Sequence, residues 1–173
     1  MILKETSFIS YKNTLGGIMN TIKILFVCHG NICRSPMAEF VMKDMVKKAG
    51  LEKEIYIASA ATSTEEIGNS VHHGTRKKLA EVGISVAGKT AVQLKKSDYD
   101  TYDFIIAMEA YNVRNIMRII GKDNENKVSL LLDFTNQSRD IADPWYTGNF
   151  DITYNDVYEG CQALLQYLKE NRL

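Results

Sequence analysis

Residues 22–36 read IKILFVCHGNICRSP, and this stretch decides the fold of the chain. The first six residues are nearly all apolar and predict a buried strand over 22–27. Beyond the turn, apolar residues at helical spacing predict an amphipathic helix with Pro36 as its first residue; they are Met37, Phe40, Val41, Met45 and Ala49. Cys28 is therefore expected at the carboxyl end of a strand, in a turn that leads into the N-terminus of a helix.

Short apolar segments alternate with helical patterns along the rest of the chain. Further strands are predicted at 55–58, 102–108 and 128–132, and helices at 75–82, 113–120 and 154–168, with a polar loop over 133–150. Such alternation is typical of an α/β fold, a parallel sheet covered by helices on both faces. Ligands in these folds bind beyond the carboxyl ends of the strands, where the Cys28 turn is expected.

Length and composition indicate one globular domain. The chain has 173 residues, and its 21 basic residues match its 21 acidic ones, so charge gives no support for a nucleic-acid or membrane partner. No apolar run could span a bilayer. Three cysteines, two of them in the same turn, do not form a disulfide framework and favour a reducing compartment. We expect a cytoplasmic monomer.

The first 20 residues differ from the rest. They show no helical stripe, and Lys4, Glu5 and Lys12 interrupt any apolar core of a signal peptide. We interpret residues 1–20 as a flexible N-terminal extension and residues 21–173 as the domain. Met19 is an alternative start of the chain, and a functional tail remains open.

The turn after Cys28 has the composition of an anion-binding loop. Unpaired backbone N–H groups and a positive dipole lie at a helix N-terminus, and Gly30 allows the N–H groups to converge. Arg34 adds a planar guanidinium that can hold two phosphate oxygens. The pKa of a cysteine falls from about 8.5 to roughly 3.5–7.5 in such places, and a hydroxyl such as that of Ser35 can stabilise the thiolate. The loop predicts a phosphate-transfer site with Cys28 as nucleophile.

A proton donor for the leaving oxygen is expected outside this loop, which contains no acid. The candidate is Asp143, followed by Pro144, Trp145 and Tyr146. Proline stiffens the segment, and the two aromatic rings offer flat apolar walls beside the acid. A metal site is disfavoured, because Cys28 and Cys33 have no second cysteine pair and the three histidines show no zinc spacing.

With both loops considered, the chain from about residue 21 onward resembles the low-molecular-weight protein tyrosine phosphatases. The resemblance implies a three-layer α/β fold with a four-stranded parallel sheet in the order 2-1-3-4. It implies that Cys28 is the nucleophile, Arg34 the phosphate clamp and Asp143 the general acid and base. The phosphate-binding loop would comprise His29, Gly30, Asn31, Ile32, Cys33, Arg34 and Ser35.

The resemblance also implies supporting roles. Asn31, Ser35 and Ser59 would hold the loop, and Cys33 would form a reversible disulfide with Cys28. Trp145, Tyr146 and Glu65 would form the walls that contact the substrate. The expected partner is a tyrosine-phosphorylated protein, with no cofactor, no metal, no nucleic acid and no membrane.

Three other functions stay open for such a loop. Arsenate reductases share it but need further cysteines, and only Cys161 remains, on the apolar stripe of the last predicted helix. Phosphoarginine phosphatases related to this family have Thr at the position of Ile32. A phosphocysteine carrier or a phosphate-binding module without turnover would not need both Arg34 and an acid loop. These features favour hydrolysis of phosphotyrosine through a phosphocysteine.

Overall fold

The computed structural model describes residues 20–173. The predicted N-terminal extension therefore lies outside the described residues, except for its last residue. Within the described part, no helix has the length and apolar character needed to cross a membrane.

The strands form one parallel sheet with β1 near its centre. β1 (Ile22–Cys28) pairs with β2 (Ile55–Ala61) on one side and with β3 (Phe104–Ala107) on the other. β4 (Val128–Leu130) pairs with β3 and completes the four-stranded order β2-β1-β3-β4. The predicted fold class and strand order are thus confirmed. All but one residue of β1 are buried, as a strand covered on both faces requires.

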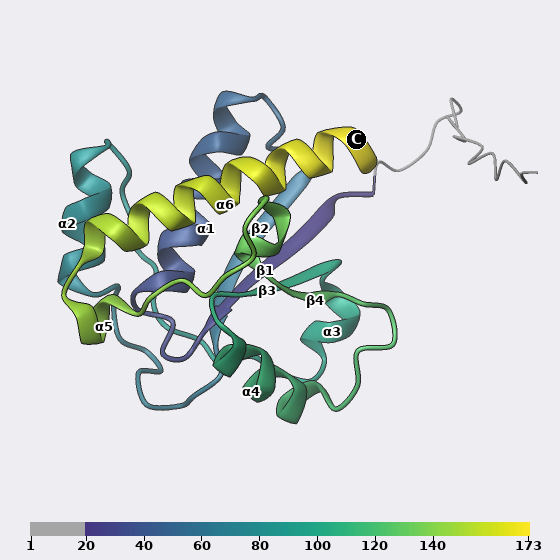
Figure 1. Cartoon of the computed structure of the whole chain (residues 1–173), viewed down its shortest axis with the longest axis horizontal. Coiled ribbons are helices and arrows are strands. Elements are labelled where there is room, and N and C mark those ends of the chain that lie inside the picture. Colours follow the sequence, from purple (N-terminus) through teal and green to yellow (C-terminus); the bar gives the residue numbers. More distant parts are fainter. Residues whose placement is uncertain (1–19) are drawn as a thin grey trace, which may run out of the picture.

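Helices cover both faces of the sheet, which gives three layers (Figure 1). α1 (Arg34–Lys48), α2 (His73–Glu81) and α6 (Phe150–Asn171) share one apolar core with one face of the sheet. α3 (Asp98–Thr101) and α4 (Ala110–Ile120) enclose a second core on the other face. The alternating strand and helix patterns therefore correspond to real layers.

Several predicted boundaries differ from the structure by a few residues, and two of these differences have a clear physical reason. The helix α1 begins at Arg34 rather than at Pro36, because proline is tolerated throughout a first turn whose N–H groups have no helical acceptor. The predicted strand over 128–132 ends at Leu130, because its partner β3 has no residue beyond Ala107 to pair with it. The chain then turns into a 3-10 helix, η1 (Leu131–Phe134), whose two leucines are buried.

The predicted polar loop over 133–150 contains one further short helix. This helix, α5 (Pro144–Thr147), follows Asp143 directly and ends at Gly148, which takes the left-handed conformation. The segment thus brings Asp143 and its aromatic neighbours to the end of the sheet where β1 terminates.

Candidate active site

The loop after β1 is closed by its own backbone and by one asparagine. Asn31 has φ +57°, the left-handed conformation that asparagine tolerates better than most residues. In that conformation its backbone N–H points at the Cys28 sulfur, at 3.3 Å. The turn therefore directs a backbone donor toward the candidate nucleophile.

A second donor reaches the same sulfur from the start of α1. The Cys28 Sγ lies 3.0 Å from the hydroxyl oxygen of Ser35, and both side chains are buried. Asn31 Nδ2 donates to that hydroxyl oxygen at 2.8 Å, which leaves the serine proton for the sulfur at 3.0 Å or for the more distant Ala60 carbonyl at 3.5 Å. The sulfur thus has two hydrogen-bonding partners beside it, the Asn31 backbone N–H and the Ser35 hydroxyl.

The orientation of the Asn31 amide is settled by its other contacts. Its Oδ1 accepts the backbone N–H of Val92 at 3.2 Å, so its Nδ2 is the donor to Ser35 and also to Ser59, at 2.9 Å. The Ser59 hydroxyl in turn donates to a carboxylate oxygen of Glu39. A directed series of hydrogen bonds thus runs from Glu39 through Ser59 and Asn31 to Ser35.

Two lysines neutralise the buried Glu39, which is 4 % exposed. Lys43 Nζ lies 2.6 Å from one carboxylate oxygen, and Lys89 Nζ lies 3.5 Å from the other. Lys89 also donates to the backbone carbonyl of Ser59 at 3.0 Å. Burial lowers the pKa of Lys89, and the nearby Glu39 carboxylate opposes that effect.

Arg34 is the most deeply enclosed cation of the site, 1 % exposed. Its Nη1 donates to Glu109 at 2.8 Å and to the Ile141 carbonyl at 3.0 Å, and its Nη2 donates to Asp143 at 3.0 Å. Burial opposes its charge, but Cys28, Asp143 and Glu109 together raise the pKa of Arg34. The guanidinium therefore stays charged and is held in one orientation.

Asp143 is positioned by the helix that it begins. One of its carboxylate oxygens accepts the backbone N–H of Trp145 at 3.0 Å, which makes it the N-cap of α5. The other oxygen accepts from Arg34. The acid is thus fixed at the end of a short helix and faces the loop that contains Cys28.

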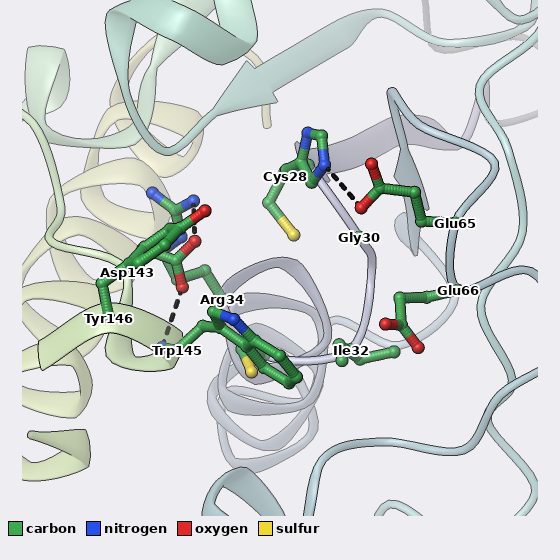
Figure 2. Close-up of a pocket in the computed structure, with 11 residues that line it drawn as sticks. Cys28, Gly30, Ile32, Arg34, Glu65, Glu66, Asp143, Trp145 and Tyr146 are labelled. Carbon is green, nitrogen blue, oxygen red and sulfur yellow. Dashed lines mark hydrogen bonds and ion pairs between the residues drawn. The ribbon is translucent and has the colours of Figure 1, made fainter. Parts of the chain in front are cut away.

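These groups meet in one pocket, shown in Figure 2. Its floor and sides come from the Cys28 loop, and its rim comes from two other segments; the lining residues are Cys28, His29, Gly30, Ile32, Cys33, Arg34, Glu65, Glu66, Asp143, Trp145 and Tyr146. The Cys28 sulfur and the Asp143 carboxylate both face this space in Figure 2. The nucleophile, the cation and the acid chosen from the sequence are therefore brought together.

The rim is aromatic on one side and acidic on the other. Trp145 and Tyr146 are both exposed, Tyr146 by 85 %. Opposite them, Glu65 contacts the His29 Nε2 at 3.2 Å, and Glu66 approaches Gly30. The structure thus places all three predicted wall residues at the pocket. Asn31, Ser35 and Ser59 lie beneath the loop rather than on its surface.

Three charged residues of the site, Glu39, Lys89 and Glu109, were not predicted from the sequence. Glu39 follows Ser35 at helical spacing and so falls on the buried stripe of α1, a signal that was available. Glu109 comes two residues after the end of β3, at the carboxyl edge of the sheet where the site was expected, so its position in the sequence was also a usable signal. Lys89 lies in an irregular segment whose pattern gives no indication of burial.

The remaining cysteines have distinct environments. Burial, followed by the nearby Cys28, raises the pKa of Cys33 to about 12, so that Cys33 stays a thiol near neutral pH. Cys161 lies on the buried side of α6, where its sulfur contacts the Ala38 carbonyl at 3.8 Å and burial raises its pKa. Across residues 20–173, no group of His, Cys, Asp and Glu side chains has the arrangement of a metal site.

Known proteins similar to this chain are phosphatases of low molecular weight. The family model of the low molecular weight phosphotyrosine protein phosphatases matches residues 23–173. The low molecular weight protein-tyrosine-phosphatase YfkJ of Bacillus subtilis is 41% identical, over 87% of this chain and 98% of the relative. The low molecular weight protein-tyrosine-phosphatase PtpA of Staphylococcus epidermidis is 37% identical, over 85% of this chain and 94% of the relative.

The fold gives the same result. The crystal structure of YfkJ from Bacillus subtilis superimposes with a TM-score of 0.87 at 40% identity, and covers 91% of this chain and 100% of that one. The family model spans the loop with Cys28, the pocket and the acid segment. The chain therefore belongs to the low molecular weight phosphotyrosine protein phosphatases, a family of hydrolases.

Proposed function

We propose that this phosphatase hydrolyses phosphotyrosine through a covalent phosphocysteine. The Cys28 thiolate attacks phosphorus, the bond from phosphorus to the tyrosyl oxygen breaks, and Asp143 gives its proton to the departing oxygen. A water molecule then attacks the phosphocysteine while Asp143 takes its proton, and the bond between sulfur and phosphorus breaks. Inorganic phosphate leaves and the thiolate is restored.

The observation that carries this proposal is the convergence of a thiol, a guanidinium and a carboxyl group in one pocket. Cys28, with two donors at its sulfur, Arg34 and Asp143 all line it, and Arg34 is bound to Asp143. Among the described contacts, the Nε–H and one Nη2–H group of Arg34 have no protein partner. These donors suit two equatorial oxygens of a phosphoryl group, whose charge they stabilise during transfer.

The exposed rings of Trp145 and Tyr146 support an aryl phosphate as the substrate. A phosphotyrosine side chain that reaches Cys28 must pass between these rings and the opposite rim. Contacts between the faces and edges of two aromatic rings contribute about 0.5–1.5 kcal/mol of binding free energy in addition to that from burying their apolar surface.

Cys161 argues against the arsenate-reductase alternative. An arsenate reductase passes a disulfide from its first cysteine to further cysteines. Cys161 on α6 is 0 % exposed in the apolar core, so its sulfur is not accessible for such an exchange. The three cysteines are free, which supports a reducing compartment such as the cytoplasm.

We further propose that Cys33 protects Cys28 from irreversible oxidation. Hydrogen peroxide would convert the Cys28 thiolate to a sulfenic acid; the Cys33 sulfur would attack it, forming a disulfide and releasing water. The high pKa of Cys33 keeps it from competing as a nucleophile for phosphorus. After peroxide treatment, peptide mass spectrometry should find a 28–33 disulfide in the native sequence and sulfinic acid at Cys28 in Cys33→Ser. Sulfinic acid in equal yield in both proteins would refute the protective role.

The catalytic proposal is tested by assaying an aryl phosphate while measuring phosphate release and arsenate reduction in parallel. We expect Cys28→Ser to abolish turnover. Asp143→Asn should slow substrates with poor leaving groups by about 10²–10⁴-fold and affect good leaving groups much less. Rapid acid quenching should trap phosphocysteine in Asp143→Asn but not in Cys28→Ser. Undiminished hydrolysis by Cys28→Ser would exclude the mechanism.

A further inference from the structure

His72 connects the Cys28 loop to the start of α2. Its backbone N–H donates to the Ile32 carbonyl at 2.8 Å, inside the loop that binds phosphate in the proposed function. Its Nδ1 accepts the backbone N–H of Gly74 at 3.1 Å and so caps α2. Only an imidazole without a proton on Nδ1 can accept this hydrogen bond.

The ring of His72 also contacts the acid segment. It lies 5.6 Å from the Trp145 ring in an edge-on arrangement, with an interplanar angle of 73°. The His72 ring also stacks on the ring of Phe150 at the start of α6, with 5.4 Å between the ring centroids and 10° between the ring planes. Its centroid lies 4.2 Å from that of the His73 ring. One imidazole therefore joins α2, α5 and α6 next to the pocket.

We propose that neutral His72 is a positioning residue for Trp145, and that its protonation releases this wall of the pocket and weakens substrate binding in mildly acidic solution. The inference rests on the proposed function for the role of Trp145 as a substrate wall. The contact between His72 and Trp145 itself does not depend on that function.

The charges around His72 favour its neutral form. His73 and Arg76 on α2 face it as cations or potential cations, Glu66 faces it from the pocket rim, and α5 and α6 contribute uncharged rings. Burial, followed by His73 and Arg76, lowers the pKa of His72, and Glu66 opposes this only in part.

The sign of the pH effect follows from this lowered pKa. An unfolded histidine has a pKa of about 6.5, so above that value both states are neutral and the contacts are fully present. As the pH falls through the lower folded pKa, the ring gains a proton on Nδ1 and loses the hydrogen bond from Gly74 that fixes its orientation against Trp145 and Phe150. The wall is therefore held at neutral pH and released on acidification.

The first test uses fluorescence without any substrate, because Trp145 is the only tryptophan in the chain. All proteins contain Asp143→Asn, which removes the carboxyl group that accepts the Trp145 backbone N–H. We expect the emission of Trp145 to change with a midpoint below pH 6.5 in this background. His72→Phe, which keeps an aromatic ring, and His72→Asn, which keeps a cap for α2, should both abolish that transition. His73→Asn is the matched control and should retain it.

The second test measures kcat and KM for an aryl phosphate between pH 5 and 7.5 in proteins that retain Asp143. The ratio of the native KM to that of His72→Phe should rise several-fold as the pH falls, whereas the kcat ratio should stay constant. Taking ratios removes the ionisation of the substrate. An unchanged fluorescence transition in His72→Phe, or a KM ratio independent of pH, would overturn the proposal. Neither result would bear on whether Cys28 is the nucleophile.

Discussion

At the scale of single residues, the charge of Glu39 sets the direction of the hydrogen bonds beneath the loop. A carboxylate can only accept, so Ser59 must donate to it and must accept from Asn31. Asn31 then also donates to Ser35, whose proton remains for the Cys28 sulfur. A group that never touches substrate thus determines which donor reaches the nucleophile.

Replacing Glu39 with glutamine should therefore destabilise the fold and slow catalysis. The amide leaves the nearly buried Lys89 without its counter-ion, and breaking a buried pair costs about 3–5 kcal/mol. Because the amide can also donate to Ser59, the series of hydrogen bonds loses its direction, the Ser35 proton is no longer directed at the Cys28 sulfur, and kcat/KM should fall. Urea unfolding and an aryl phosphate assay measure the two effects.

Two further variants distinguish the effect of losing the buried Glu39–Lys89 pair from the effect of removing any carboxylate from α1. Asp44→Asn removes a carboxylate from the exposed pair with Lys48 on the same helix, and should change the free energy of unfolding by about 1 kcal/mol or less. Adding Lys89→Met to Glu39→Gln should recover part of the lost stability. A loss in Glu39→Gln no greater than in Asp44→Asn would contradict the role given to the pair.

At the scale of elements, α6 holds one face of the sheet by a close approach at Gly160. A Cβ at this position would lie 2.5 Å from Leu131 Cγ in η1, a distance that no packed side chain tolerates. Leu131 itself is buried in the core beneath α6. The strand β4 thus ends where its chain must turn its leucines toward this helix.

Gly160→Ala should lower the free energy of unfolding by about 1–3 kcal/mol through overpacking, although alanine raises helix propensity by about 1 kcal/mol. Gln162→Ala, on the exposed side of the same helix, should change it by no more than about 0.5 kcal/mol. Urea denaturation of both variants measures the difference. Stabilisation by Gly160→Ala would mean that Leu131 can move aside.

Elements with a strong local pattern were predictable, and those defined by neighbours were not. β1, the helix after it and Gly121 at the end of α4 each follow from apolar spacing and a helix stop in the sequence. The end of β4 depends on the length of β3, and the short helix α5 depends on an Asp143 cap within a polar segment. The local hydrophobic pattern therefore predicts neither the end of β4 nor the helix α5.

At the scale of the whole molecule, the parallel sheet explains why distant residues could be joined by reasoning from the sequence. β1 and β3 run in one direction, so Cys28 at the end of β1 lies at the edge of the sheet where β3 also ends, and the loops that follow both strands meet there. Asp143 could be chosen by the company of Pro144 and Trp145. The burial of Lys89, by contrast, arises only when its irregular segment packs against α1, and no local signal precedes that event.

The same architecture predicts where the folding unit begins. β1 is an inner strand, and its first residue, Ile22, donates through its backbone to Glu54 before β2 and is 5 % exposed. The family model begins at residue 23. We propose that the phosphatase domain begins at residue 21 and that residues 1–20 contribute neither to its stability nor to its catalysis.

A chain that starts at residue 21 after an initiating methionine should therefore keep the melting temperature of the full chain within about 1 °C and its kcat/KM within about twofold. A chain that starts at residue 26 lacks Ile22 and Ile24, which are buried in the core on one face of the sheet, and Leu25, which is buried in the core on the other face. Burying one such side chain contributes about 1.5–3 kcal/mol, so the loss of three matches the whole stability of a typical domain. We expect this shorter chain to unfold. Calorimetry and an aryl phosphate assay distinguish the two chains, and a drop of several degrees on removing only residues 1–20 would place the boundary earlier in the sequence.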